Sequence, residues 1–74
     1  MAKQKIYYSY KDKTPKAFCE EKFIYSFEST GSPVAYIEQK VWYDLKNYSP
    51  IAFEEDDIVY DYLSNTPKYI IAFE

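Results

Sequence analysis

The sequence predicts an all-β fold of four quasi-equivalent β-hairpin units around a pseudo-four-fold axis. Three observations lead to this prediction: a motif that recurs about every 17 residues, alternation of apolar residues within each copy, and chain ends that read as two halves of one copy. An internal repeat indicates that one small structural unit is built several times, so the repeat is the first guide to the fold.

The first half of each unit is predicted to be a strand centred on a tyrosine. Each tyrosine lies in an alternating segment of mostly aromatic or branched residues: Ile6/Tyr8/Tyr10, Phe23/Tyr25/Phe27, Val41/Tyr43/Leu45 and Ile58/Tyr60/Tyr62. The tyrosines are separated by 17, 18 and 17 residues. Residues two apart lie on the same side of a strand, and these residue types suit a half-buried sheet. We therefore expect Tyr8, Tyr25, Tyr43 and Tyr60 to face the core.

The second half of each unit is predicted to be a short strand that follows a Ser-Pro or Thr-Pro turn. The first three copies are residues 14–20 (TPKAFCE), 32–38 (SPVAYIE) and 49–55 (SPIAFEE). The fourth copy begins at Thr66-Pro67, and its Ala72-Phe73 pair matches the others only with a short insertion. Turn-forming residues separate these segments from the tyrosine strands.

A helical alternative follows from the same prolines, because Ser or Thr followed by Pro also begins helices. Residues 32–48 carry a fair helical stripe of apolar side chains. The other copies do not sustain it, and the acidic residues 54–57 would stand in the middle of a helix. These conflicts favour strands.

The N-terminal strand, residues 5–10, is predicted to complete the last unit by pairing with residues 68–74. This pairing would remove the strand edges that an open sheet exposes. We expect a single domain over residues 1–74, with units at approximately 5–21, 22–39, 40–56 and 57–74.

The composition argues against several classes of chemistry. The 74 residues include no His and one Cys, so a Ser/His/Asp triad, a His-ligated metal and an internal disulfide are excluded. No apolar run approaches the ~20 residues of a membrane span, and residues 1–4 lack the apolar stretch of a signal peptide. The net charge of −3 and basic residues that are all Lys make nucleic acid a poor partner. We expect a cytoplasmic protein without membrane contact, cofactor or catalytic site.

Three sets of residues are candidates for function. Cys19 occupies the repeat position of Ile37 and Glu54, and we expect it to be a structural filler. The acidic run 54–57 lacks the spacing of a calcium loop and is expected to be a solvated turn. Glu20, Glu38 and Glu55 fall at equivalent positions, so they are candidates for an axial polar ring; charges at strand ends are the alternative.

The face opposite the repeated tyrosines is also apolar. It is either covered by the Ala-aromatic strands or exposed as a contact patch, because tyrosine and tryptophan are favoured at interfaces. The candidate contact surface consists of Tyr7, Ile24, Trp42, Tyr48 and Val59.

The segments Pro-Val-Ala-Tyr-Ile-Glu (33–38), Pro-Ile-Ala-Phe-Glu-Glu (50–55) and Ile-Ile-Ala-Phe (70–73), with the strands between them, resemble the four-fold beta flower domain of small bacterial proteins. The resemblance runs from about Lys5 to Phe73 and implies an all-β fold with four-fold pseudo-symmetry, without an established activity. It also implies glycine-containing turns before the prolines, of which this chain keeps only Gly31.

The sequence therefore favours a non-catalytic β module that binds a protein partner, or itself, through an aromatic surface. Its Lys-, Tyr- and Ile-rich composition is typical of AT-rich genomes, and small accessory proteins of phages or mobile elements are one such class. The alternative is a small-molecule binding module with an aromatic axial pocket.

Overall fold

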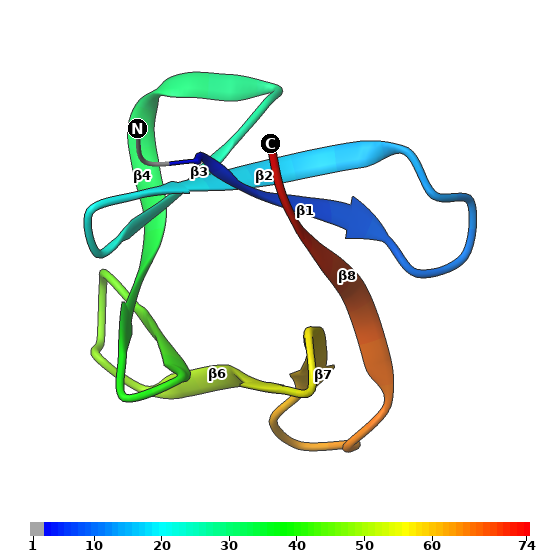
Figure 1. The fold of residues 1–74 in the computed structure, drawn as a ribbon. Coiled ribbons are helices and arrows are strands. Elements are labelled where there is room, and N and C mark those ends of the chain that lie inside the picture. The colour runs from blue at the N-terminus through cyan, green and yellow to red at the C-terminus, as the bar shows by residue number, and fades with distance from the viewer. Residues whose placement is uncertain (1–2) are drawn as a thin grey trace.

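The computed structural model describes residues 3–74, apart from the side chains of residues 29 and 30. The start of the chain, expected to lack a signal peptide, lies partly outside this range. Within it the chain forms eight strands: β1 (Lys5–Ser9), β2 (Pro15–Glu20), β3 (Phe23–Ser26), β4 (Ser29–Glu38), β5 (Val41–Asp44), β6 (Pro50–Glu55), β7 (Ile58–Asp61) and β8 (Pro67–Phe73). Each pairs antiparallel with the next and β1 with β8, which closes a barrel (Figure 1). The predicted all-β fold of four hairpin units is confirmed.

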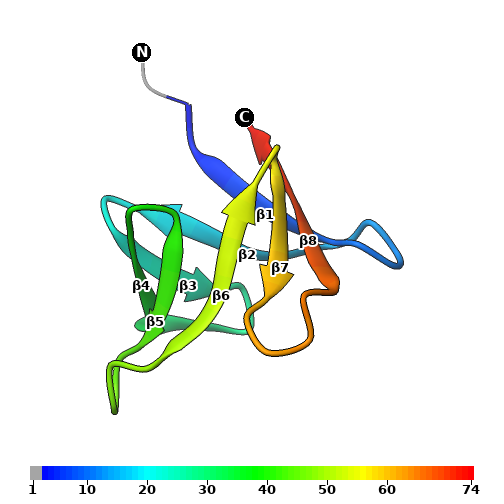
Figure 2. The ribbon, with the colours of Figure 1, turned by 90° about the horizontal axis from the view of Figure 1, so that it is seen from below.

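Closure joins the two ends of the chain along the full length of β1. Five residue pairs connect β1 to β8, from Lys5 opposite Phe73 to Ser9 opposite Tyr69. Beyond them, Gln4 and Glu74 exchange two backbone hydrogen bonds of 2.8 and 2.9 Å. β1 and β8 accordingly lie side by side in both ribbon views (Figures 1 and 2). The N-terminal strand thus completes the last unit, as expected.

One irregularity recurs in every unit. The tyrosine of each first strand lies opposite the proline of the second strand, and the register shifts just before it: Tyr8–Pro15, Tyr25–Pro33, Tyr43–Pro50 and Tyr60–Pro67. β-Bulges bend a strand and increase its twist. A bulge at the same place in each hairpin therefore gives so small a sheet the curvature that closure requires.

The fourth unit follows this register without an insertion, which corrects the sequence-based alignment. Val59 lies opposite Tyr69 just as Tyr7 lies opposite Ala17 and Trp42 opposite Ala52. Tyr69 therefore occupies the alanine position of the other copies. The smaller Val59 stands where the other copies carry Tyr, Ile or Trp, so a large residue faces a small one in this unit as well.

The barrel interior is filled by three sets of four side chains. The tyrosine strands contribute Tyr7, Ile24, Trp42 and Val59, and the second strands contribute Ala17, Ala35, Ala52 and Tyr69, followed by Cys19, Ile37, Glu54 and Ile71. The expectation that Tyr8, Tyr25, Tyr43 and Tyr60 face the core is wrong, since they alternate with these buried positions and stand on the outer side. Alternation separates two faces of a strand but cannot identify the inner one when both are apolar.

The turns reach left-handed backbone conformations without glycine. Gln39-Lys40 and Asp56-Asp57 have positive φ at both residues, the pattern of type I′ hairpin turns. At the other end of the barrel, Lys13, Tyr48 and Asn65, each two residues before a proline, have φ of 63°, 60° and 59°. Gly31 holds the equivalent place in the second unit, yet its φ is not positive. Non-glycine residues therefore hold these turns in a backbone conformation that favours glycine.

Removing residues 2–10 is expected to unfold the whole domain, because it deletes β1 and leaves β2 and β8 as unpaired edges. Circular dichroism during thermal unfolding measures this directly. A truncated protein that still melts cooperatively near the temperature of the full chain would contradict closure by β1.

Asp57→Gly is expected to raise the free energy of unfolding by about 0.5–1 kcal/mol, because glycine adopts positive φ without steric cost. Gly31→Ala is the matched control. A Cβ at Gly31 would have no atom within 4 Å, so that substitution should leave stability unchanged or slightly higher. Urea unfolding measures both variants, and a less stable Asp57→Gly protein would refute the strain.

Candidate functional site

The predicted contact surface is largely inside the barrel. Tyr7, Ile24 and Val59 are fully buried and Trp42 is 5% exposed, so these four residues form the core and not a patch. The prediction was wrong for these four residues for the same reason as for the repeated tyrosines: both faces of the strands are apolar. Tyr48, the fifth member, is 66% exposed and does lie on the surface.

The carboxylate inside the barrel is Glu54, one residue before a member of the predicted ring. Glu20, Glu38 and Glu55 are exposed at the ends of their strands. Because residues alternate along β6, Glu54 shares the inner face with Ala52, whereas Glu55 shares the outer face with Phe53. The acidic residues are therefore charges at strand ends, apart from Glu54.

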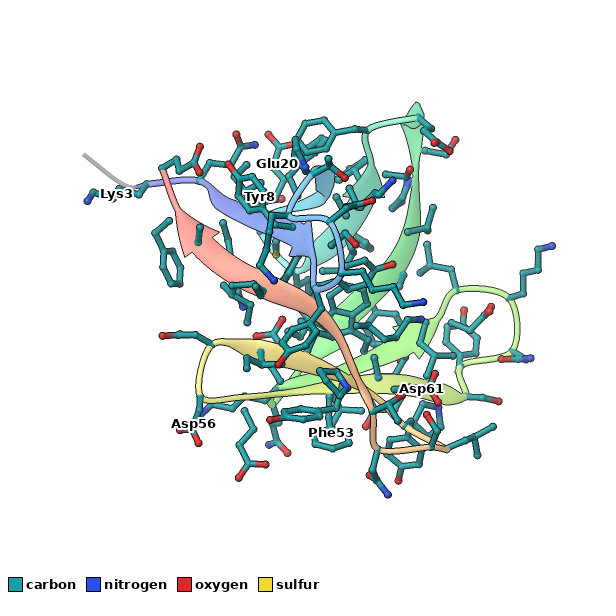
Figure 3. All side chains as sticks on the ribbon, turned by 90° about the vertical axis from the view of Figure 1, so that its right-hand side faces the viewer. Lys3, Tyr8, Glu20, Phe53, Asp56 and Asp61 are labelled. Carbon is teal, nitrogen blue, oxygen red and sulfur yellow. The ribbon has the colours of Figure 1, made fainter. Side chains whose placement is uncertain are left out.

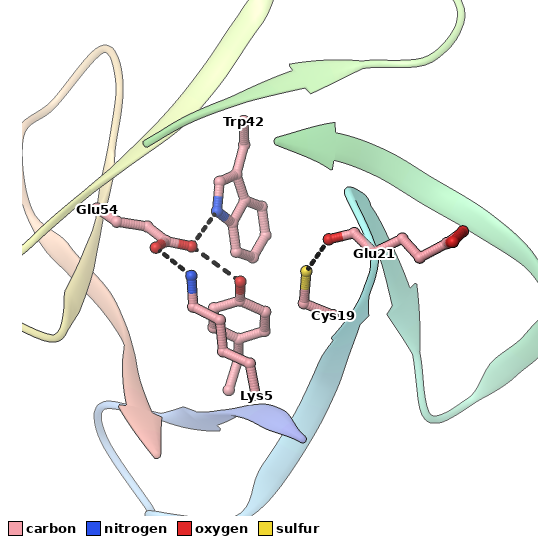
Figure 4. Close-up of polar contacts among 6 residues, drawn as sticks. Lys5, Cys19, Glu21, Trp42 and Glu54 are labelled. Atoms are coloured by element: carbon pink, nitrogen blue, oxygen red, sulfur yellow. Dashed lines mark hydrogen bonds and ion pairs between the residues drawn. The ribbon is translucent and has the colours of Figure 1, made fainter. Parts of the chain in front are cut away.

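Glu54 lies at the centre of a network that crosses the barrel (Figure 4). Its Oε2 atom accepts hydrogen bonds from the Tyr7 hydroxyl at 2.8 Å and from Trp42 Nε1 at 2.9 Å. Its Oε1 atom pairs with Lys5 Nζ at 2.6 Å. The Tyr7 ring meets the Trp42 ring edge to face at 4.8 Å. Three donors from β1 and β5 thus satisfy a carboxylate that is 9% exposed.

Two groups near Glu54, the Tyr7 hydroxyl and the Cys19 thiol, have raised pKa values. Burial, with the Glu54 carboxylate beside it, raises the pKa of the Tyr7 hydroxyl far above its ordinary value. Burial also raises the pKa of the Cys19 thiol, whose Sγ donates to the Glu21 carbonyl oxygen at 3.5 Å (Figure 4). An activated cysteine needs the opposite shift. The geometry favours the expected structural role for Cys19.

A hollow of about 400 Å³ opens at the end of the barrel that carries the short hairpin turns. It is lined by Lys5, Lys40, Glu54, Glu55, Asp56, Asp57, Ile71 and Phe73. Figure 3 shows Asp56 in the turn at this end and Asp61 at the far end of β7. The axis itself is filled by side chains, as Trp42 stacks on Tyr69 with ring centres 5.8 Å apart. The hollow is thus a charged mouth with one aromatic side chain, unlike the aromatic axial pocket of the alternative prediction.

The outer wall carries three aromatic clusters at equivalent places. In the second cluster, Tyr36 stacks on Tyr43 at 5.1 Å and Tyr48 stands edge-on at 6.1 Å. The third cluster repeats this arrangement with Phe53, Tyr60 and Tyr62 at 5.3 and 6.4 Å, and Figure 3 shows Phe53 on the outer side of its strand. The first cluster consists of Phe18, Tyr25 and Phe27.

The fourth equivalent place, between β8 and β1, departs from this pattern. Ile70 lies opposite Tyr8 there, and the Tyr8 hydroxyl donates to the Glu74 carboxylate. That hydrogen bond raises the pKa of Tyr8. The outer clusters were not predicted as such because Tyr25, Tyr43 and Tyr60 were expected to face the core, although Tyr48 was expected on the surface. The sequence did carry a signal for these clusters. In each of the first three units a Phe or Tyr directly follows the alanine, and these rings pair with the repeated tyrosines of the next strand.

No known family, curated protein or solved structure matches this chain. Over residues 3–74, no group of three or more His, Cys, Asp or Glu side chains is placed to hold a metal ion. No helix in the same range is long and apolar enough to cross a membrane.

Glu54→Gln is expected to lower the free energy of unfolding by about 2–4 kcal/mol, because the amide removes the charge that Lys5 pairs with and brings its own N–H toward three donors. Urea unfolding measures the change. Glu55→Gln, one residue away and exposed, is the control and should change stability by less than about 0.5 kcal/mol. Equal effects of the two substitutions would contradict the network.

Alkaline pH is expected to destabilise the protein through Tyr7. Its pKa is raised on folding, so its stabilising contribution is complete below the ordinary tyrosine pKa of about 10 and falls as pH rises further, by up to about 1.4 kcal/mol per pH unit. Urea unfolding between about pH 8 and pH 11 measures the slope. In Tyr7→Phe the slope should be shallower, and an unchanged slope would show that Tyr7 ionises freely in the fold.

Proposed function

We propose that this protein is a non-catalytic binding module that contacts a partner protein, or a second copy of itself, through its outer aromatic clusters. The observation that supports this function is the recurrence of stacked rings on the outer wall, each with a more exposed third ring beside it. Tyrosine is enriched at interface hot spots, and an aromatic surface gains free energy when a partner covers it.

Inside the barrel, the surroundings of Glu54 and Cys19 support a structural role for both residues. Glu54 already accepts hydrogen bonds from three donors, and burial raises the pKa of the Cys19 thiol. Both features argue against a role of either group as a base or nucleophile. We extend the proposal to a small accessory protein of a bacterium, phage or mobile element that works in the cytoplasm, where an unpaired cysteine such as Cys19 stays reduced.

A second candidate function is binding of a small molecule in the hollow at the barrel mouth. Its volume of about 400 Å³ falls within the usual range of ligand pockets, and Glu54 lies in its wall. A ligand in this hollow would contact Glu54, which accepts a hydrogen bond from the Trp42 indole, so binding should shift the fluorescence of Trp42. A protein on the outer clusters should leave that fluorescence unchanged, which distinguishes the two functions.

The double variant Tyr48→Ser/Tyr62→Ser is expected to lose the self-association or the partner binding of the native protein. Both rings are exposed, at 66% and 44%, so their removal should leave the fold intact. Light scattering over a wide concentration range measures self-association, and affinity capture from a bacterial lysate measures partner binding. Tyr10→Ser is the matched control, because Tyr10 is also exposed but lies outside the clusters.

The proposal requires that self-association or captured proteins persist in Tyr10→Ser and disappear in the double variant. A wild-type protein that stays monomeric and captures the same proteins as the double variant would refute it. Thermal unfolding of all three proteins verifies that the comparison is made between folded chains.

A further inference from the structure

Charge is divided unevenly around the barrel. Residues 1–21 contain five Lys and three acidic residues, whereas residues 22–74 contain four Lys and nine acidic residues. The second and third clusters lie in the acidic part, and exposed Glu38 and Glu55 alternate onto the same outer faces as Tyr36 and Phe53. Partial burial, and next the charge of the nearby Glu38 carboxylate, raise the pKa of the Tyr36 hydroxyl. Aromatic rings and carboxylates therefore share one region of the wall.

The outward residue after each proline divides the wall in the same way. It is Lys16 in the first unit and Lys68 in the fourth, but Val34 and Ile51 in the second and third. Val34 and Ile51 are 48% and 37% exposed. The wall around the second and third clusters is thus apolar as well as acidic, with an exposed apolar border.

Lysine side chains of the protein already lie over other rings. Among the described residues, Lys13 Nζ lies 5.0 Å from the centre of the Tyr10 ring, and the other two such contacts are Lys5 on Tyr7 and Lys68 on Tyr69. None of these rings belongs to the outer clusters, so the cluster rings remain open to a cation from outside. The acidic and apolar surroundings then distinguish the second and third clusters from the first, which has Lys16 beside it.

We infer, on the basis of the proposed binding function, that the second and third clusters bind arginine side chains of a partner protein. In each cluster a stacked pair and a ring at 62° or 82° to it form a corner. A guanidinium group can stack on one ring of such a corner while the carboxylates nearby favour its charge. Because the two clusters lie on adjacent hairpins joined by the β5–β6 pairing, one arginine-containing segment can reach both.

Arginine suits this surface better than lysine. The guanidinium is planar and weakly hydrated, so it stacks on aromatic rings at a smaller desolvation cost than an ammonium group. All nine basic residues of this chain are lysines, so a second copy cannot supply a guanidinium. The partner that fits is a different protein with exposed arginines.

A peptide of alternating Arg and Gly is the probe for this inference, with alternating Lys and Gly peptide of equal length as its charge-matched counterpart. Calorimetry measures affinity, and amide chemical-shift mapping on the wild-type protein locates the site. We expect the Arg peptide to bind more tightly and to shift residues of the second and third clusters. Tyr48→Ser/Tyr62→Ser should weaken its binding about tenfold, and Tyr10→Ser should leave it unchanged.

Equal affinity for the two peptides, shifts outside these clusters, or no weakening in the double variant would overturn the inference. Absence of binding by the Arg peptide would do so too. The proposed function would survive these results if the double variant still lost the proteins captured by the wild type, whereas both would fail if capture were also unchanged.

Discussion

The interior of this barrel depends on the hydrogen bonds and the ion pair that the Glu54 carboxylate makes. An unpaired buried carboxylate would cost several kcal/mol, and here the hydroxyl of Tyr7, the indole of Trp42 and the ammonium of Lys5 offset that cost. Satisfying Glu54 fixes two of the largest interior rings in one geometry. It also ties β1 to β5 and β6 across the barrel, so the strand that closes the sheet is held from within as well as along its edges.

The narrow interior explains which residues can point inward. Alanine at positions 17, 35 and 52 lies opposite a larger side chain, and the fourth unit keeps this complementarity by placing Tyr69 opposite Val59. An eight-stranded barrel has room for side chains alone, and a second large residue in these pairs would overfill it. Where a copy departs from the repeat, as at Glu54 and Tyr69, the residue therefore fits the space inside its own unit.

Much of the fold could be predicted from the sequence, but the inner and outer faces could not. The repeat, the alternation and the matching chain ends were enough to give the strands, the hairpin units and closure by the N-terminal strand. Tyr7 and Tyr8 are both aromatic neighbours on one strand, so hydrophobicity alone could not assign either to the core. Glu54 was hidden for a related reason, since a single carboxylate in an acidic run gives no sign that donors from distant strands will surround it.

The many aromatic residues have two different roles, one on each face of the barrel wall. Rings inside the barrel stabilise a chain of only 74 residues, and rings outside it form the surface that we propose for binding. This division is the central claim, and the fluorescence of Trp42 tests it most directly, because it is the only tryptophan. The account predicts a blue-shifted emission maximum and weak quenching by acrylamide in the folded protein. Emission and quenching equal to those of free tryptophan would contradict it.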